Sequence, residues 1–237
     1  MKIRTNPIIA IDGPAGSGKS TVAALAARKA GLQFISSGSM YRAVALQALR
    51  GGVMLANREA IIALAAALDI SFTTEIDGTI RTFIGAEDVT EALRAPAVGQ
   101  ISSVIAAIAE VREHLVDKQR EYGTDGGIVM EGRDIQTVVF PDADVKIFLD
   151  ASVAERARRR WKELRAKNVA VSYAEVEQEV KTRDQQDCER DASPMRAAGD
   201  AVILDTDGRT IDQVVDDIVQ LIRDSKSMLA ENRKKRD

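Results

Sequence analysis

The sequence has a single cysteine and a single histidine among its 237 residues. One cysteine, Cys188, excludes an intrachain disulfide, and one histidine, His114, leaves too few Cys and His ligands for a structural zinc site. This usage suits a reducing compartment, so we expect the chain to be cytoplasmic. His114 lies in a charged stretch typical of a solvated helix, which makes it a poor candidate for the base of a Ser-His-Asp triad.

Long apolar runs and an excess of positive charge are also missing. The apolar run near the first residue is shorter than a signal peptide or a membrane span requires. With 33 basic and 36 acidic residues the formal charge is -3, so the net charge does not call for a nucleic-acid partner. The basic tail is typical of a solvated, frayed end. We therefore expect no membrane contact, no nucleic acid and, because no apolar stripe is left over, a monomer.

Short apolar segments alternate along the chain with stretches of helical periodicity. Residues 8–11 form an apolar run that ends at Asp12-Gly13 and predicts a buried strand. Further strands are expected at 32–35, 128–130, 145–149 and 202–204. Helices are expected at 19–30, 40–50, 58–68, 97–121, 153–167, 173–189 and 211–225. Strands separated by helices favour an α/β fold with a five-stranded parallel sheet and helices on both faces.

One segment breaks this alternation. The stretch ISFTTEIDGTIRTFI, within about 70–90, alternates in polarity and is rich in β-branched residues. Asp77-Gly78 at its centre tolerates the positive φ angles of a tight hairpin turn. We expect a small antiparallel β insertion here.

A phosphate-binding loop follows the first expected strand. Residues 13–20, GPAGSGKS, match G-x-x-x-x-G-K-[ST] between a strand and a helix, which is the context that makes this pattern specific. Its glycines let backbone N–H groups point at phosphate oxygens, and the helix directs its positive end to the same place. Lys19 would reach the β- and γ-phosphates of ATP, and Ser20 would ligate Mg²⁺. The nucleotide-binding candidates are Asp12, Gly13, Pro14, Ala15, Gly16, Ser17, Gly18, Lys19, Ser20 and Thr21.

A P-loop NTPase-type sheet indicates a nucleotide but no particular reaction. Asp205-Thr206-Asp207-Gly208 matches the D-x-x-G of a GTPase switch. However, the guanine-reading N-K-x-D pattern is absent, and the D-x-x-G lies near the end of the chain, so we interpret it as a loop. The signature sequence of transporter ATPases is absent too.

Arginines gather on expected helix faces in the second half of the chain. Arg156, Arg159 and Arg160 are spaced i, i+3, i+4, and Arg183, Asp187 and Arg190 are spaced i, i+4, i+7. Clustered like charges destabilise a fold unless an anion lies between them, and a transferring phosphoryl group is such an anion. Arginine suits this task because its planar fork grips two oxygens at once. Beside a P-loop, we favour this interpretation over a merely solvated helix.

The segment Glu131-Gly132-Arg133-Asp134 directly follows an expected strand. Ligand groups gather at the carboxyl ends of parallel strands. Glu131 could hold a metal-bound water there, Arg133 could grip a phosphate, and Asp134 could accept from an amino group of a base.

Taken together, the motifs resemble the bacterial cytidylate kinases over nearly the whole chain. The matching segments are IDGPAGSGKST, SSGSMYR at 36–42, EGRDIQTVVFPDADVKIFLDAS at 131–152, ERARRR at 155–160, RDQQDCER at 183–190 and the hairpin insertion. The resemblance implies a nucleoside monophosphate kinase with three parts. These are a P-loop core at 1–39 and 97–237, a monophosphate-binding region at 40–96 that includes the insertion, and a short lid at about 154–170.

The resemblance also implies roles for the matching positions. The cytosine edge would be read by Ser103, Arg112 and Asp134. The ribose hydroxyls would be held by Arg183 and Asp187. The monophosphate would be held by Arg42, Arg133 and Arg190, with Ser37 and Tyr41 along its approach. The ATP phosphates would be contacted by Arg156 and Arg160 from the lid, and Arg159 is a further candidate. The residues expected to act directly in transfer are Lys19, Arg133, Arg156, Arg160 and Arg190.

The chain departs from the family pattern at three positions. Family members usually carry aspartate where Ser36 and Glu131 stand, and often glycine where Gln136 stands. Glu131 keeps the carboxylate but reaches further, whereas Ser36 carries no charge. Glu131 is expected to meet the metal through water.

These expectations converge on transfer of a phosphoryl group from ATP·Mg²⁺ to CMP or dCMP in pyrimidine nucleotide metabolism. A phosphate acceptor with a second pKa of about 6 is already ionised at neutral pH, so no general base is required. The alternatives are a UMP or shikimate-type kinase, and a nucleotide-binding regulatory or scaffold protein. An acceptor panel would separate all of these.

Overall fold

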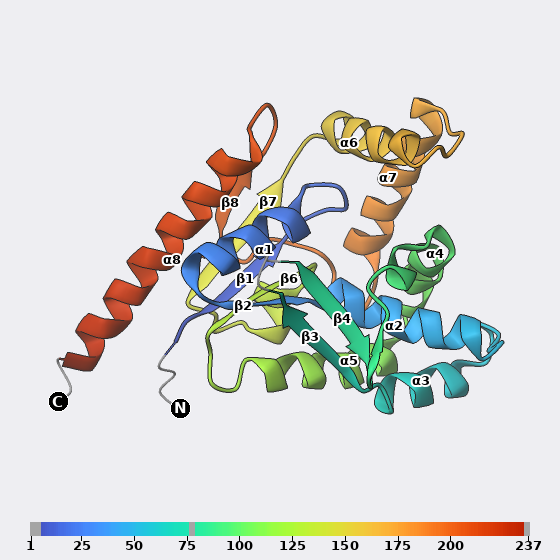
Figure 1. Ribbon diagram of the computed structural model, residues 1–237, viewed down its shortest axis with the longest axis horizontal. Helices are drawn as coiled ribbons and strands as arrows, with labels where there is room; N and C mark the ends of the chain where they lie inside the picture. Colours follow the sequence, from blue (N-terminus) through green and yellow to red (C-terminus); the bar gives the residue numbers. More distant parts are fainter. Residues whose placement is uncertain (1–5, 76–78, 235–237) are drawn as a thin grey trace.

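The five segments expected to be strands pair into one parallel sheet in the computed structural model, which describes residues 6–75 and 79–234 (Figure 1). The order is β2-β6-β1-β7-β8, with every neighbouring pair parallel. Their bounds are β1 Ile8–Asp12, β2 Gln33–Ser36, β6 Ile128–Gly132, β7 Val145–Asp150 and β8 Val202–Asp205. The predicted sheet is confirmed.

Both faces of the sheet are covered, which explains why its central strand is a continuous apolar run. Ile8 and Ala10 of β1 pack into one core with α2 (Ser37–Arg50) and α5 (Ala109–Tyr122). Ile9 and Ile11 pack into the other core with α1 (Lys19–Ala30) and α8 (Ile211–Lys234). Helices α1 and α8 lie side by side on that face (Figure 1).

Helices α6 (Val153–Ala166) and α7 (Tyr173–Glu189) pack together at one end of the molecule, and the lid predicted at about 154–170 comprises most of α6 and the segment that follows it (Figure 1). A cluster of Ala157, Leu164, Val176 and Val180 joins them apart from the two main cores. Polar caps set their first turns, because Ser152 accepts from a backbone N–H of α6 and Ser172 makes a capping box with Glu175. The sequence predicted both helices to within a residue.

The antiparallel insertion is also present. Strand β3 (Ile70–Thr74) pairs with β4 (Ile80–Ile84), and the partners run from Ile70 opposite Ile84 to Thr74 opposite Ile80. The expected turn residues Asp77-Gly78 lie outside the described residues. A short third strand, β5 (Glu87–Asp88), pairs with the end of β4, and the sequence pattern did not predict it.

The prediction of one helix over 97–121 is wrong, because two helices, α4 (Pro96–Ile105) and α5, replace it. Ile108 between them is extended, with φ -82 and ψ 115, and its side chain is buried, as is that of Ile105. The Arg112 guanidinium donates to the Ala106 carbonyl at 3.2 Å, which satisfies an acceptor freed at the end of α4. The break is therefore made by tertiary contacts, without a glycine or proline to mark it.

The other boundaries differ less. Helix α2 begins at Ser37 because Ser36 caps it, and α8 continues past 225 to Lys234. Helix α3 spans Arg58–Ala66, and two short turns, η1 (Ala92–Arg94) and the wide π-helical η2 (Ile135–Val139), complete the described elements. No helix in residues 6–75 and 79–234 is long and apolar enough to cross a membrane.

Candidate active site

The carboxyl ends of β2, β6 and β1 bring the predicted site together. The strand register sets Ser36 of β2 opposite Glu131 of β6, and Gly132 of β6 opposite Asp12 of β1. The phosphate loop leaves β1 at the same edge and leads into α1 at Lys19. The parallel sheet therefore places the loop beside segment 131–134, as the sequence predicted.

Two glycines of the loop are required by close approach of the backbone. A Cβ at Gly13, whose φ is +149, would lie 2.0 Å from the carbonyl oxygen of Leu149. A Cβ at Gly16, whose φ is +80, would lie 3.2 Å from the Cβ of Arg156. The loop thus winds tightly between β7 and α6, with conformations that only glycine adopts at low cost.

Lys19 lies inside this loop as a buried cation. Its side chain is 4% exposed, and Nζ donates to the Pro14 carbonyl at 2.7 Å and to Ser17 Oγ at 3.4 Å. Burial, together with the nearby positive charge of Arg133, holds the pKa of Lys19 well below its usual value. An amine in this environment gains most from an anion in the loop, such as the β- or γ-phosphate of a nucleotide.

A cluster of oxygen atoms lies beside the loop. Glu131 Oε1 accepts from Ser36 Oγ at 2.7 Å and from Ser20 Oγ at 3.1 Å. Ser37 Oγ donates to the Glu131 carbonyl at 2.8 Å, which fixes the backbone there. Hydroxyl and carboxylate oxygens are the ligands that Mg²⁺ prefers, so this donor set fits that ion. No group of three or more His, Cys, Asp or Glu side chains that could hold a metal occurs in the described part of the chain.

A ring of guanidinium groups lies next to these oxygens. Arg133 Nε donates to Asp187 at 2.8 Å, and Arg190 Nη1 lies 3.7 Å from the other oxygen of that carboxylate. Burial and the charge of Arg133 lower the pKa of Arg183 to about 10, and burial lowers the pKa of Arg42. Buried nitrogens Arg183 Nε and Arg190 Nη2 have no hydrogen-bond partner among the described residues. This arginine ring, formed by Arg42, Arg133, Arg183 and Arg190, therefore has buried N–H groups that an anion could bind.

Two of the three predicted base-reading residues, Arg112 and Asp134, form a buried ion pair. Arg112 Nη2 donates to Asp134, and both side chains are at most 6% exposed. The guanidinium carbon of Arg112 lies 5.4 Å from the centre of the Tyr41 ring, a cation–π contact. Burial raises the pKa of Tyr41 to about 12, and its hydroxyl has no hydrogen-bond partner in the described structure. Ser103 bonds weakly within its own helix, to the Gly99 carbonyl at 3.4 Å.

The three arginines of α6 do not share one set of partners. Arg156 is buried, forms two hydrogen bonds with Asp184 of α7 at 2.9 and 2.6 Å, and donates to the Ala15 carbonyl at 3.1 Å. Arg159 donates to the Ser17 carbonyl and twice to Thr206. Arg160 pairs with Glu163 at 2.9 Å and is 37% exposed. Only Arg156 and Arg159 contact the loop, and each does so through a backbone carbonyl.

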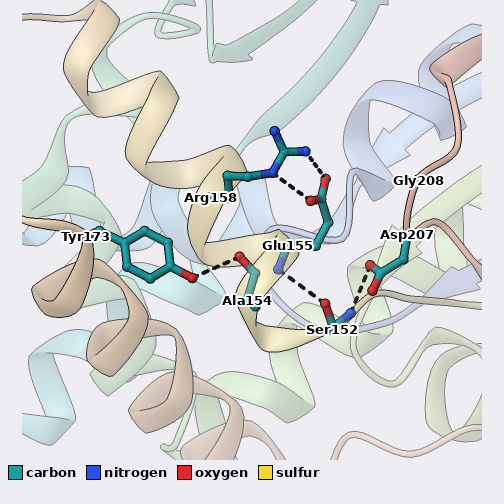
Figure 2. A pocket seen from close by; sticks show the side chains of 7 residues that line it. All are labelled: Ser152, Ala154, Glu155, Arg158, Tyr173, Asp207 and Gly208. Carbon is teal, nitrogen blue, oxygen red and sulfur yellow. Dashed lines mark hydrogen bonds and ion pairs between the residues drawn. The ribbon is translucent and has the colours of Figure 1, made fainter.

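A shallow hollow of about 460 Å³ lies at the base of the lid (Figure 2). Its lining links the start of α6 to the loop after β8, since the Ser152 N–H donates to Asp207 at 3.0 Å. Tyr173 of α7 closes another side, with its hydroxyl donating to the Ala154 carbonyl at 3.2 Å (Figure 2). Residues 206–208 thus form the loop after β8, in agreement with the interpretation of 205–208 from the sequence, and Asp207 ties this loop to the start of α6.

Comparison with known proteins places this geometry in a family. The Cytidylate kinase family model matches residues 9–224. The chain belongs to the cytidylate kinase family. It is 49% identical to a cytidylate kinase of Pelotomaculum thermopropionicum over 90% of this chain and 94% of the relative, and 48% identical to one of Desulfitobacterium hafniense over 94% and 95%. The resemblance stated from the motifs is confirmed.

Among solved structures, an uncharacterised protein from Eubacterium ventriosum is similar in fold. The TM-score is 0.51 at 13% identity, over 92% of this chain and 99% of that one. At that identity the likeness concerns the fold alone.

Within this cytidylate kinase family site, sequence reasoning missed the residues that hold others in place. Asp12, predicted to bind nucleotide, is fully buried and accepts from the backbone N–H groups of Ile135 at 3.0 Å and Gln136 at 2.8 Å. Gln136 accepts from the Ala198 N–H at 3.0 Å, and Asp184 holds Arg156. The only available signal was that Gln136 departs from the usual glycine. The ligand-binding roles of all the named residues remain predictions.

Proposed function

We propose that this chain transfers the γ-phosphoryl group of ATP to CMP or dCMP, giving ADP and CDP or dCDP. One observation carries the proposal. Six cationic side chains gather at the phosphate loop and around the Arg112–Asp134 pair, and three of their buried nitrogens, Arg112 Nε, Arg183 Nε and Arg190 Nη2, have no hydrogen-bond partner among the described residues. These cations are Lys19, Arg42, Arg112, Arg133, Arg183 and Arg190, and the buried carboxylates closest to them include Asp12, Glu131, Asp134 and Asp187.

Two nucleotides laid end to end would supply the missing negative charge. Triphosphate oxygens would meet the N–H groups of the loop and Lys19 on one side, and the CMP phosphate would meet Arg42, Arg133 and Arg190 on the other. The acceptor oxygen is ionised at neutral pH because its pKa is about 6. Catalysis then rests on in-line alignment and on charge neutralisation, without a general base.

Recognition of cytosine rests on the buried Arg112–Asp134 pair. The Asp134 carboxylate would accept from the N4 amino group, and Arg112, held against Tyr41 and the Ala106 carbonyl, would donate to O2 or N3. Uracil has an acceptor at its 4-position, so it would face an acceptor and leave Asp134 without a proton donor.

Magnesium would be held by Ser20 and, through water, by Glu131. When bound with the triphosphate, Mg²⁺ neutralises charge that develops on the phosphate oxygens. The segment at about 154–170 would serve as a lid that excludes water over the core at 1–39 and 97–237, while the region 40–96 would carry the acceptor.

An acceptor panel with ATP·Mg²⁺ tests the proposal. ADP release is measured by a coupled assay with CMP, dCMP, UMP and shikimate, each at several concentrations. We expect kcat/KM for CMP and dCMP to exceed that for UMP by at least about tenfold, as a lost buried hydrogen bond requires. The highest value with UMP or shikimate would replace the proposed acceptor, and traces with every acceptor would indicate a nucleotide-binding regulatory protein.

A further inference from the structure

One carboxylate oxygen of Glu131 joins the two sides of the site. Oε1 accepts from Ser20 Oγ, which lies on α1 next to Lys19, and from Ser36 Oγ, which precedes α2. Helix α1 begins the ATP side, and α2 carries Arg42 and Tyr41 of the acceptor side. Ser36 and Glu131 are 7% and 5% exposed, so water competes little for this bond.

The direction of the bond from Ser36 is fixed by its second contact. Ser36 Oγ caps α2 by accepting from the Ser39 N–H at 3.3 Å. A hydroxyl has a single proton to donate, and with the cap in place that proton points to Glu131 at 2.7 Å. Ser36 and Glu131 are partner residues on the neighbouring strands β2 and β6, which brings their side chains within hydrogen-bond distance.

The hydrogen bonds at Glu131 Oε1 leave two groups available to bind a metal ion or its waters, the lone pairs of Ser20 Oγ and the second carboxylate oxygen, Glu131 Oε2. Ser20 donates its own proton to Glu131, so the lone pairs of Ser20 Oγ are free for a hard cation. No described hydrogen bond goes to Glu131 Oε2. A glutamate has three side-chain torsions, so without a second anchor its carboxylate would sample several orientations here.

We propose that Ser36 is a positioning residue for the magnesium site. By donating to Oε1 it holds the long Glu131 side chain in the orientation that accepts from Ser20 and leaves Oε2 without a described hydrogen bond, available to the metal through water. This inference rests on the proposed function, because it takes ATP·Mg²⁺ as the donor. In this role Ser36 acts through Glu131 and without contact to the metal or the nucleotide, because its hydroxyl orients the Glu131 carboxylate.

Metal binding tests this role directly. Mn²⁺ binding to the enzyme with a non-hydrolysable ATP analogue is measured by electron paramagnetic resonance. We expect Ser36→Ala to weaken Mn²⁺ binding about tenfold, as losses around metal ligands do. Ser36→Thr keeps the hydroxyl and should stay within about threefold of wild type. Glycine is tolerated at a helix N-cap but has no hydroxyl, so Ser36→Gly should bind Mn²⁺ as weakly as Ser36→Ala. It takes the place of Ser36→Ala in the test if that variant folds poorly.

A matched control and a double variant complete the test. Asn57→Ala removes the cap of the neighbouring helix α3, where Asn57 accepts from the Ala60 N–H, and should leave Mn²⁺ binding unchanged. In a Glu131→Ala background, Ser36→Ala should cause no further loss. Wild-type binding by Ser36→Gly, or an equal loss in the Glu131→Ala background, overturns the proposal. Failure of wild type to phosphorylate CMP would instead count against the proposed function, since Mn²⁺ binding is read without turnover.

Discussion

Arg183 should be a residue that lowers the stability of the free enzyme and strengthens its binding of CMP. It lies on α7, its Nε is buried without a hydrogen-bond partner in the described chain, and burial together with the positive charge of Arg133 lowers its pKa to about 10. The folded protein thus holds this proton less tightly than the unfolded chain, so at neutral pH the charge costs stability. At about 1.4 kcal/mol per tenfold change in proton affinity, the cost is about 3 kcal/mol.

We therefore predict that Arg183→Met stabilises the protein without ligands. Methionine keeps most of the side-chain volume and removes the charge. Because part of Arg183 reaches solvent, we expect a gain of about 1 to 2 kcal/mol, or roughly 2 to 8 °C in Tm for a chain of this length. The same variant should lower kcat/KM for CMP about 10- to 150-fold, the effect of losing one charged hydrogen bond worth about 1.5 to 3 kcal/mol.

Tm from thermal unfolding and kcat/KM for CMP from steady-state kinetics, measured on the same preparations, test the two parts of this prediction. Arg223→Met on the exposed side of α8 is the matched control and should change neither Tm nor kcat/KM appreciably. A lower Tm together with a kcat/KM within threefold of wild type would refute the reasoning, because Arg183 would then be a structural residue outside the site.

Three further predictions follow from the same geometry. Lys19→Ala should lower kcat by about 10³ or more, because transition-state charge loses its nearest partner; turnover within tenfold of wild type in the coupled assay would contradict this. Arg112→Ala should lower the ratio of kcat/KM for CMP to that for UMP at least about tenfold, since the buried Asp134 loses its orientation; an unchanged ratio would remove Arg112 from base reading. Burial raises the pKa of Asp12 from 3.8 to about 7, so its contribution to stability is full below about pH 4 and is lost as the pH rises through about 7. Asp12→Asn should flatten the fall of Tm between pH 5 and pH 7.5, and a profile as steep as that of wild type would show that another group titrates.

Much of the fold could be predicted because its apolar patterns are local. The run at 8–11 indicated a buried strand, and helical periodicity indicated a helix at 173–189, the bounds of α7. The break between α4 and α5 could not be predicted, because Ile108 leaves the helix to bury its side chain and Arg112 caps the freed carbonyl. The burial of Ile108 depends on core segments that are distant in the sequence, and the Arg112 contact spans only six residues but carries no recognisable sequence signal.

The site was predictable to the extent that sheet topology determines it. The loop after β1 and the end of β6 lie at one edge of the parallel sheet, so the expected gathering of 13–20 and 131–134 at the carboxyl ends of the strands is confirmed. The choice of partner for each arginine was not predictable. Arg156 pairs with Asp184 because the packing of α6 against α7 brings that acid near, whereas Arg160 pairs with Glu163 three residues along its own helix and is drawn away from the loop.

Two nucleotides should lie end to end between the loop at residues 13–20 and the arginine ring. A crystal structure with a bisubstrate analogue, adenosine and cytidine joined by five phosphates, would locate both. We expect phosphate oxygens within hydrogen-bond distance of Lys19, Arg42, Arg133 and Arg190, with the cytosine edge at Asp134. Guanidinium groups turned to bulk solvent, with the phosphate chain bound elsewhere, would contradict it.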